Sequence, residues 1–446
     1  MKKLLAILIT ISILASLAAC GGTKGSTDGS ASTAKASTSS AATTASPKEP
    51  AELTFWIFLN PQQTDDPRSV ALKEIVDGFN ASNGKTKIKV ESIHYSKIDS
   101  QVIQAVAAGA GPDILNVYTD LLQMHVKAKT IQPVTTYAKK WLEKVGTDYI
   151  YSEDQLKLNN EIMNIPWEAR IFTMYYRKDL YEKAGLSAPA TLSELMDSAA
   201  KVSDQNRLGF AIGLSEGANA ASFVESFVPI LRASGGEMFD SSGKAIFNSD
   251  AGVKAIQFFK DIVAKGAMTD QTLTMTADDI TNGLKAGNIA TAFAGSMRAS
   301  AIRKSDVGKN IVTAPIPPFE KGQPSPVMVA GQTLTIGINT KYPDNAWEFI
   351  EYFLSKDSEI KWAKAGVMPV LSSVYDDPSI KELSNYAELV QWKESANKYG
   401  KIVYYPEDYT KLCTELAKAV QKIIFQNAPV KETLDSVANT YNSTKK

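Results

Sequence analysis

Few residues of this sequence have the types and spacing needed for metal, redox or nucleophilic chemistry. The 446 residues include only two cysteines and two histidines. Cys413 lies in an apolar helical pattern and is interpreted as a small packing residue. The four side chains are too scattered along the chain to predict a zinc cluster or a redox pair. We therefore expect no metal ion and no other cofactor. The four residues are Cys20, Cys413, His94 and His125.

Paired acids are the second kind of residue that could do chemistry. A glycoside hydrolase places two carboxyl groups across the bond that it cleaves. Asp278-Asp279 and Asp376-Asp377 are neighbours in sequence, so they do not face each other on a helix, and helix capping explains them better. No nucleophile elbow, zinc-binding helix motif or phosphate loop is present. We expect a protein that is not an enzyme, and keep a secreted glycoside hydrolase as the alternative.

Aromatic residues beside polar ones point to carbohydrate recognition. Sugars have apolar C–H faces and polar rims, so their sites combine flat aromatic walls with amides and carboxylates. Trp56 lies on the first predicted strand, and Tyr405 precedes a proline near the end of the chain. Trp167 is followed by Glu168 and Arg170, whose planar guanidinium could stack on a ring and donate hydrogen bonds. For each aromatic residue, packing in the core is the alternative.

Polar residues that follow predicted strands form the other part of the candidate site. Tyr118 and Asp120 follow the third strand, and Glu216 follows a later one. Asp120 could instead cap a helix that begins near Leu121, and Glu216 could lie in a solvated turn. The remaining candidate ligand-binding residues are Asn60, Ser296, Met297 and Gln332.

The elements that would position these residues alternate in type. From Glu52 onward, apolar runs of strand length alternate with stretches of helical periodicity. The order strand, helix, strand, helix, strand predicts parallel strands joined by helices, with a ligand site beyond the carboxyl ends of the strands. The predicted strands are 53–58, 88–93 and 113–117, and the helices span the apolar repeat from Val70 to Phe79 and residues 98–108.

The rest of the chain predicts a second α/β lobe that is richer in helix. Its strands are expected at 170–176, 208–214, 289–294, 311–316 and 333–338. Its helices are expected at 192–202, 219–234, 250–265, 278–287, 344–355, 357–365, 379–397, 408–426 and 430–442.

Composition limits the possible partners. A chain of this length exceeds what one hydrophobic core supports, so two or three domains are expected. Lys+Arg 48 balances Asp+Glu 48, so no net charge attracts nucleic acid, and no nucleic-acid partner is expected. The hydrophobic fraction of 44% and charged fraction of 22% are typical of a soluble folded protein.

The first residues have the layout of an export signal. Lys2 and Lys3 precede the apolar run 4–14, which is too short to span a bilayer permanently. Leu17-Ala18-Ala19-Cys20 resembles a bacterial lipobox, in which cleavage exposes a cysteine that carries a lipid. Residues 1–19 are therefore expected to be a lipoprotein signal peptide. Residues 20–50, rich in Gly, Ser, Thr and Ala, are expected to be a lipidated cysteine and a disordered tether.

Four segments of the body resemble the family 1 extracellular solute-binding proteins, the carbohydrate receptors of ABC importers that include maltose-binding protein. Their order and spacing, together with the lipobox, cover nearly the whole chain. They are Ala107-Ala108-Gly109-Ala110-Gly111-Pro112-Asp113-Ile114, Ile165-Pro166-Trp167 with Met174 to Leu180 and Ala184-Gly185-Leu186, Lys285 to Ser296, and Gly331 through Asn345-Ala346-Trp347 to Met368-Pro369-Val370.

The resemblance implies a fold and a function. The fold is the α/β, two-lobed periplasmic-binding-protein type II fold, in which each lobe is a doubly wound sheet flanked by helices and the ligand cleft lies between the lobes. The expected lobes are 51–167 plus 318–356 and 168–317 plus 357–446, with hinges near 166–169 and 315–319. The function is capture of a mono- or oligosaccharide by hinge closure and delivery to a membrane-spanning ABC permease. A peptide, polyamine or metal chelate in the same fold is the alternative ligand.

The resemblance also bears on location and on single residues. The protein is expected to be a monomer outside the cytoplasm, held at the outer face of the cell membrane by a lipid on Cys20. Trp167 would lie where the family's chain passes between lobes. After Ser296 the family often has a tryptophan that stacks on the sugar, and here the residue is Met297. Methionine is not a flat platform, so the stacking partner is expected elsewhere.

Overall fold

The computed structural model describes residues 50–216, 221–325, 327, 329–399 and 404–445. Within this body the first sheet has three parallel strands in the order β2, β1, β3. β12 continues the sheet antiparallel to β3, and β4 and β7 both pair with β12. The strands are β1 (Ala51–Ile57), β2 (Thr86–Ser92), β3 (Ile114–Tyr118), β4 (Ile131–Gln132), β7 (Ile165–Pro166) and β12 (Gln332–Gly337).

Helix α1 (Pro67–Ser82) illustrates why the sequence forms these elements. Asp66 caps it by accepting a hydrogen bond from the Arg68 backbone N–H, and a proline occupies its first turn. Its buried residues recur at helical spacing, and Phe79 packs edge-on against Phe349 with ring centroids 5.1 Å apart. The helices of the first sheet are α1, α2 (Tyr95–Ala107), α3 (Leu122–Lys127), α4 (Thr135–Val145), α5 (Glu153–Leu156), α12 (Pro343–Phe353) and α13 (Lys356–Lys364).

The second sheet is built on β8 (Arg170–Arg177), all eight residues of which are buried. Its neighbours β9 (Thr291–Gly295), β10 (Ile311–Ala314) and β11 (Val329–Ala330) pair with it antiparallel. Apolar and aromatic residues dominate 170–176, as is typical of a strand buried on both faces, which is why this strand could be predicted.

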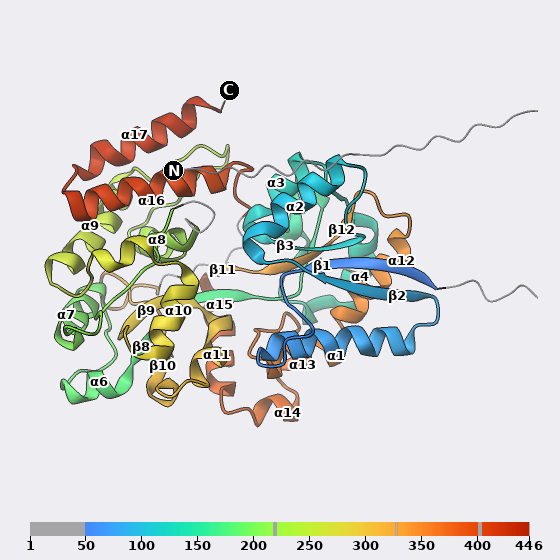
Figure 1. Cartoon of the computed structure of the whole chain (residues 1–446), viewed down its shortest axis with the longest axis horizontal. Helices are drawn as coiled ribbons and strands as arrows, with labels where there is room; N and C mark the ends of the chain where they lie inside the picture. The colour runs from blue at the N-terminus through green and yellow to red at the C-terminus, as the bar shows by residue number, and fades with distance from the viewer. Residues whose placement is uncertain (1–49, 217–220, 326, 328, 400–403, 446) are drawn as a thin grey trace, which may run out of the picture. The chain divides into compact units, whose positions relative to one another are not determined.

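A separate core lies on the other side of Figure 1 from β1 and β2, and the helices that form it with this second sheet are α6 (Lys178–Lys183), α7 (Leu192–Val202), α8 (Ala221–Ala233), α9 (Asp250–Ala264), α16 (Tyr409–Gln426) and α17 (Val430–Ser443). The buried residues of four more helices belong instead to the core that also contains the first sheet. These helices are α10 (Ala277–Ala286), α11 (Ala299–Arg303), α14 (Pro378–Lys381) and α15 (Tyr386–Tyr399). The remaining short elements are β5 (Lys157–Leu158), β6 (Glu161–Ile162), and the 3-10 turns η1 (Thr119–Leu121), η2 (Gly146–Asp148), η4 (Asp270–Thr274), η5 (Ser296–Arg298), η6 (Gly308–Asn310) and η7 (Ser372–Val374). In the described part of the chain, no helix combines the length and apolarity needed to cross a bilayer.

Two predicted elements differ from the structure. Residues 208–214 form isolated bridges to the β9 region instead of a strand, at Leu208 and Ala211. Gly209 explains the close packing here, because a Cβ atom on it would lie 1.9 Å from the Ala199 carbonyl oxygen. The single helix expected at 379–397 is divided into α14 and α15.

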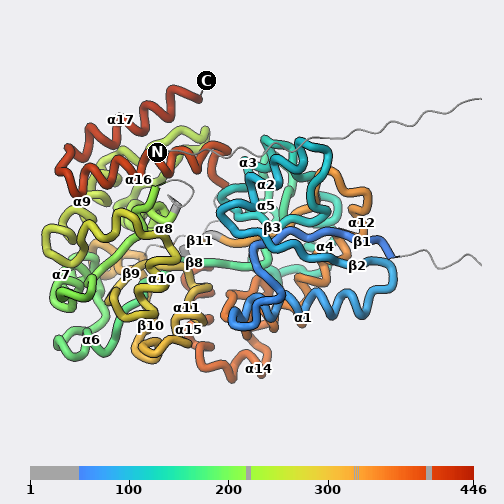
Figure 2. The backbone as a smooth tube through the Cα atoms, viewed as in Figure 1, coloured from blue at the N-terminus to red at the C-terminus, as the bar shows by residue number. Residues whose placement is uncertain are grey.

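The chain passes between the two sheets at neighbouring points. β7 belongs to the first sheet and β8 to the second, so the first passage is at 167–169. β11 pairs with β8 whereas β12 pairs with β3, so the chain returns at Gly331. β8 and β11 can be followed side by side along the tube in Figure 2. The return was expected at 315–319, but the chain stays on the second sheet for about a dozen residues more, because β11 adds to β8.

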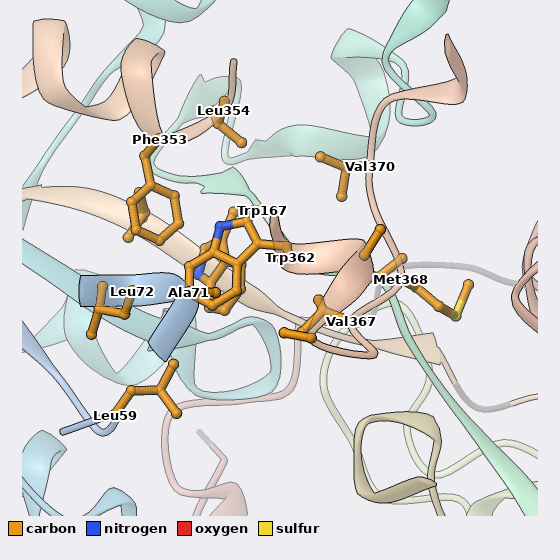
Figure 3. Packing of buried hydrophobic residues seen from close by; sticks show 14 of the residues in the cluster. Leu59, Ala71, Leu72, Trp167, Phe353, Leu354, Trp362, Val367, Met368 and Val370 are labelled. Atoms are coloured by element: carbon orange, nitrogen blue, oxygen red, sulfur yellow. The ribbon is translucent and has the colours of Figure 1, made fainter. Parts of the chain in front are cut away.

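Helix α13 also differs from the expected division, which assigned residues from 357 onward to the second lobe. It packs on α1 and α12, beside the first sheet. Trp362 on α13 lies against Trp167 with ring centroids 4.6 Å apart, and against Phe353 at 5.3 Å (Figure 3). This aromatic cluster draws α13 to the first sheet because burying two indole rings there removes a large apolar surface from water.

Glu359 is a fully buried carboxyl group on the same helix. Its Oε2 accepts a hydrogen bond of 2.7 Å from the Val370 backbone N–H. Burial raises the pKa of Glu359 well above its ordinary value, although the Val370 and Leu371 N–H groups oppose the shift. Glu359 thus ties α13 to the segment that contains Met368, which bridges to Ala169 in the passage between the sheets.

We predict that Glu359→Gln alters the pH dependence of stability. Because its pKa is raised in the folded protein, Glu359 keeps its proton when folded and releases it on unfolding at any pH between the ordinary and the raised pKa. The contribution of Glu359 to stability therefore falls as pH rises. Glutamine does not ionise, so the melting temperature of the variant minus that of the unmodified protein should increase by roughly 1–3 °C between pH 5 and pH 8. Glu348→Gln, at an exposed position on α12, is the control. Parallel melting profiles for Glu359→Gln and the unmodified protein would contradict the prediction.

Candidate functional site

A cavity of about 830 Å³ is lined by residues from the helices and strands of both sheets. On the first-sheet side it is lined by α2, by η1 and by the turn that follows β1. On the second-sheet side it is lined by the start of β8 and by α8, α10, η5 and α11. The cavity therefore lies beyond the carboxyl ends of β1 and β3, where ligands of α/β proteins bind.

The corner between β3 and η1 brings Tyr118 and Asp120 to the cavity wall. Asp120 caps neither η1 nor α3, since neither element has a side-chain cap hydrogen bond. Its Oδ1 atom is buried and has no hydrogen-bond partner among the described residues. Burial raises the pKa of Asp120 to about 6, against a lowering effect of its backbone N–H and of Arg170.

Arg170 and Glu168 form a buried ion pair at the first passage between the sheets. The Arg170 Nε atom donates to Glu168 Oε1 at 3.0 Å, and its Nη2 atom donates to Oε2 at 3.3 Å. Although burial disfavours the charged guanidinium, the Glu168 carboxylate and Tyr118 raise the pKa of Arg170. The guanidinium carbon lies 5.4 Å from the centre of the Tyr118 ring, within cation–π range. Arg170 lines the cavity, and Glu168 holds it from behind.

Aromatic rings supply flat surfaces on this wall. Phe58 stacks on Tyr118 with ring centroids 6.3 Å apart and an angle of 27° between the planes. Phe172 on β8 and Tyr409 on α16 line the cavity from the second-sheet side. The arrangement has the flat surfaces and polar rims that suit a sugar ring.

The opposite wall carries a second set of charged groups. Arg298 donates hydrogen bonds of 2.8 Å to Asp278 and to Thr281. Although burial opposes it, hydrogen bonds from Tyr95 and Arg298 lower the pKa of Asp278. Glu225 on α8 forms no ion pair of this kind with any described residue, and burial raises its pKa to about 7, opposed by Arg298 and Arg170.

Polar side-chain contacts also join the walls. The Tyr95 hydroxyl on α2 donates to Asp278 on α10 at 2.6 Å. Lys127 on α3 forms a surface ion pair of 2.7 Å with Glu407, just before α16. The first contact is at the cavity and partly shielded from water, so it contributes more than the exposed pair.

Several candidate residues lie in the core instead of at the cavity. Trp167 is fully buried between the sheets, where its Nε1 atom donates to Asn116 Oδ1 at 2.9 Å. Figure 3 shows its ring overlapping that of Trp362. Trp56 packs beside the small cluster that contains Ile98 under α2. These two rings are not among the lining residues, because the first-sheet core takes them.

Gln332, Ser296 and Tyr405 are also buried and are not among the lining residues. Gln332 Oε1 accepts a hydrogen bond of 2.5 Å from Asn116. The Ser296 hydroxyl accepts one of 3.4 Å from the Ile171 N–H. The Tyr405 ring packs against Tyr409, with centroids 4.4 Å apart.

The remaining candidate residues lie at the cavity, at the surface or outside the described residues. Met297 lines the cavity. Asn60 is exposed in a turn where its side chain accepts from the Gln62 N–H, and Glu216 is also exposed. Cys20 lies outside the described residues. The structure therefore brings Tyr118, Asp120, Arg170 and Met297 to one cavity, with Glu168 directly behind Arg170.

Sequence reasoning missed Phe58, Tyr95, Glu225, Asp278 and Arg298. Phe58 could have been predicted from its position at a strand end. It follows directly after β1, just as Tyr118 is the last residue of β3. The assignment of both acids of the 278–279 pair to helix capping is incomplete. Asp279 forms a capping box with Thr276, whereas its neighbour faces the cavity. Glu225 and Arg298 gave no local signal, since only the fold brings them together.

No cluster of three or more His, Cys, Asp or Glu side chains suited to a metal ion occurs in the described ranges. Cys413 is buried on α16. The cavity offers hydrogen bonding, ion pairing and ring stacking, which are the interactions of a binding site.

Comparisons with known proteins agree with this geometry. Residues 65–360 match the family model described as bacterial extracellular solute-binding protein. The galactooligosaccharide-binding protein of Bacillus subtilis is 22% identical to the chain over 98% of this chain and 96% of its own length. The sn-glycerol-3-phosphate-binding periplasmic protein of Yersinia enterocolitica is 25% identical, covering 73% of this chain and 75% of its own.

A solved structure shows the same fold. Maltose-bound MalE3 of T. maritima superposes with a TM-score of 0.74, 21% identity, and coverage of 88% of this chain and 100% of its own. The fold is thus the α/β fold of periplasmic binding proteins, as expected. Because the family model covers more than half of the chain, the chain belongs to the bacterial extracellular solute-binding proteins, which are binding proteins and not enzymes.

Proposed function

We propose that this protein is the receptor of an ABC importer, which captures a mono- or oligosaccharide in the cavity and delivers it to a membrane-spanning permease. The observation that carries the proposal is the wall formed by Tyr118, Phe58 and Arg170, which combines stacked rings with a fixed hydrogen-bond donor. A B. subtilis relative binds galactooligosaccharides and the T. maritima structure holds maltose, which supports a carbohydrate ligand.

Capture is proposed to occur by hinge closure. Ligand contacts from both walls favour the closed state, and only that difference in affinity shifts the equilibrium. The proposed hinges are the passages at 167–169 and at Gly331, together with the segment around Met368 that bridges to Ala169. Strand ends and single residues can absorb the backbone rotation while the cores of the two sheets stay packed.

Tyr118→Ala tests the stacking wall. Loss of the ring should weaken binding of whichever carbohydrate stabilises the unmodified protein in a thermal-shift screen by roughly 10–100-fold, measured by calorimetry. Tyr137→Ala is the control, because Tyr137 also stacks on an aromatic ring, Trp347, but does not line the cavity. Unchanged affinity in Tyr118→Ala, or a screen in which no carbohydrate binds, would contradict the proposal.

Tyr95→Phe tests closure. The variant loses one hydrogen bond between the walls, so the ligand-free protein should populate more open conformations, and affinity should fall roughly 2–10-fold. Small-angle scattering of the ligand-free protein should give a larger radius of gyration. Tyr137→Phe is the matched control. It also removes a tyrosine hydroxyl that donates to an aspartate, Asp344 at 2.5 Å, but both residues lie on the first-sheet side. A radius equal to that of the unmodified protein in Tyr95→Phe would argue against the Tyr95–Asp278 contact as part of closure.

We also propose that the protein is a lipoprotein outside the cytoplasm. Residues 1–19 would be removed as a signal peptide, Cys20 would carry the lipid, and residues 21–50 would form the tether. One lipid anchor with a tether keeps the body beside the membrane without inserting it.

Cys20→Ala tests the anchor. The variant should leave the membrane fraction or keep its signal peptide, as read by fractionation and intact-mass spectrometry. Cys413→Ala is the control, since that thiol is buried on α16. A variant at position 20 that still carries lipid and stays in the membrane fraction would end the lipoprotein proposal.

A further inference from the structure

Two carboxyl groups in the cavity form no ion pair with any described residue, although the charge of Arg170 acts on both. Asp120 Oδ1 is buried without a hydrogen-bond partner among the described residues. Glu225 lines the cavity from α8, and within the same residues no hydrogen bond or ion pair reaches its carboxyl group. The two groups are close enough to each other and to Arg170 for their charges to interact.

The arginines inside the cavity are compensated by neighbouring carboxylates. Arg170 is paired with Glu168, and Arg298 with Asp278. Arg68 is paired with Asp66 at 3.1 Å. Asp99 is hydrogen-bonded to the buried His125 ring at 2.9 Å, and its charge helps to raise the pKa of Asp120. The groups without such partners at the cavity margin are exposed to solvent, which screens their fields. They are Asp65, Lys285 and Lys304, with His94 close to Asp278.

This arrangement leaves Asp120 and Glu225 as the carboxyl groups of the cavity interior that have neither an arginine nor a histidine as a side-chain partner among the described residues. A buried carboxylate without a partner is unfavourable, which is why burial raises both pKa values. A neutral hydroxyl could donate one hydrogen bond to such a group. An ammonium group donates up to three and also adds charge attraction in a site of low dielectric constant. An anionic ligand would instead meet two like charges.

From this excess of unpaired carboxyl groups we infer that the carbohydrate captured by this protein carries a protonated amine, which Asp120 and Glu225 bind together. The inference rests on the proposed function, because the aromatic wall of Tyr118 and Phe58 takes the ring of the same ligand. Arg170 does not repel the amine strongly, because Glu168 neutralises it at 3.0 Å. The ligand class is therefore an amino sugar or an oligosaccharide that contains one.

The test compares sugars that differ only in amine and hydroxyl. The probes are glucosamine with glucose, galactosamine with galactose, mannosamine with mannose, and chitosan disaccharide with cellobiose, measured by calorimetry at pH 7.5 on the purified protein. At least one amino sugar should bind tenfold or more tightly than its hydroxyl partner. sn-Glycerol 3-phosphate is the anionic probe and should bind more weakly than the preferred amino sugar.

The variants Glu225→Gln and Asp120→Asn assign the preference to these residues. Each should reduce the ratio of amino-sugar to neutral-sugar affinity by about tenfold, and Glu348→Gln, exposed on α12, should leave it unchanged. The preference should also fall between pH 7.5 and pH 5, as both carboxyl groups take up protons. Glu225→Gln should flatten this profile, which assigns the pH dependence to the Glu225 carboxyl group.

The outcomes distinguish failure of the amine inference from failure of the proposed carbohydrate function. If neutral sugars bind and no amino sugar binds better than its partner, the amine inference is wrong and the carbohydrate proposal stands. A preference that survives in both variants would also overturn the assignment. If no sugar of either kind binds, both the inference and the proposed carbohydrate function fail.

Discussion

The passage of the chain between the two sheets is the constraint on which the binding site depends. At this point the Trp167 N–H donates to the Gln332 carbonyl oxygen at 3.0 Å, and the Thr119 N–H donates to the Gly331 carbonyl oxygen at 3.2 Å. A Cβ atom at Gly331 would lie 2.4 Å from the Glu168 carbonyl oxygen, so only glycine lets the two strands pass this closely. These contacts hold the end of β3 and the start of β8 together, which brings Tyr118 beneath Arg170.

Charge compensation then decides what the cavity can bind. Arg170 is kept charged inside the protein because Glu168 binds it through two hydrogen bonds. A buried arginine held in this way is rigid, so it offers its remaining N–H groups in fixed directions. Asp278 is balanced by Arg298 from its own side and also binds Tyr95 from the other side. The polar groups of the cavity are thus ordered before a ligand arrives, which lowers the entropic cost of binding.

The division of aromatic residues between core and cavity follows from side-chain direction. Trp56 and Trp167 carry the largest rings among the candidates, and both serve packing. Trp167 and Trp362 meet between the first sheet and α13, where their burial helps to hold the passages together. The smaller rings of Phe58 and Tyr118 lie at strand ends, so they are free to face the cavity. A ring's size therefore says less about ligand contact than its place on the strand.

Sequence alone determined the helices and most strands, because a buried face leaves its period in the order of apolar residues. The helices at 192–202 and 250–265 and the strands of the first sheet could be predicted for that reason. It also identified Tyr118, Asp120 and Arg170, which flank strands and lie at the cavity. The tertiary structure alone decided which side chains interact with one another at the cavity. Glu225, Asp278 and Arg298 come from separate helices and turns, and no local pattern records which side chains a fold brings across a cavity or which charges it leaves unpaired.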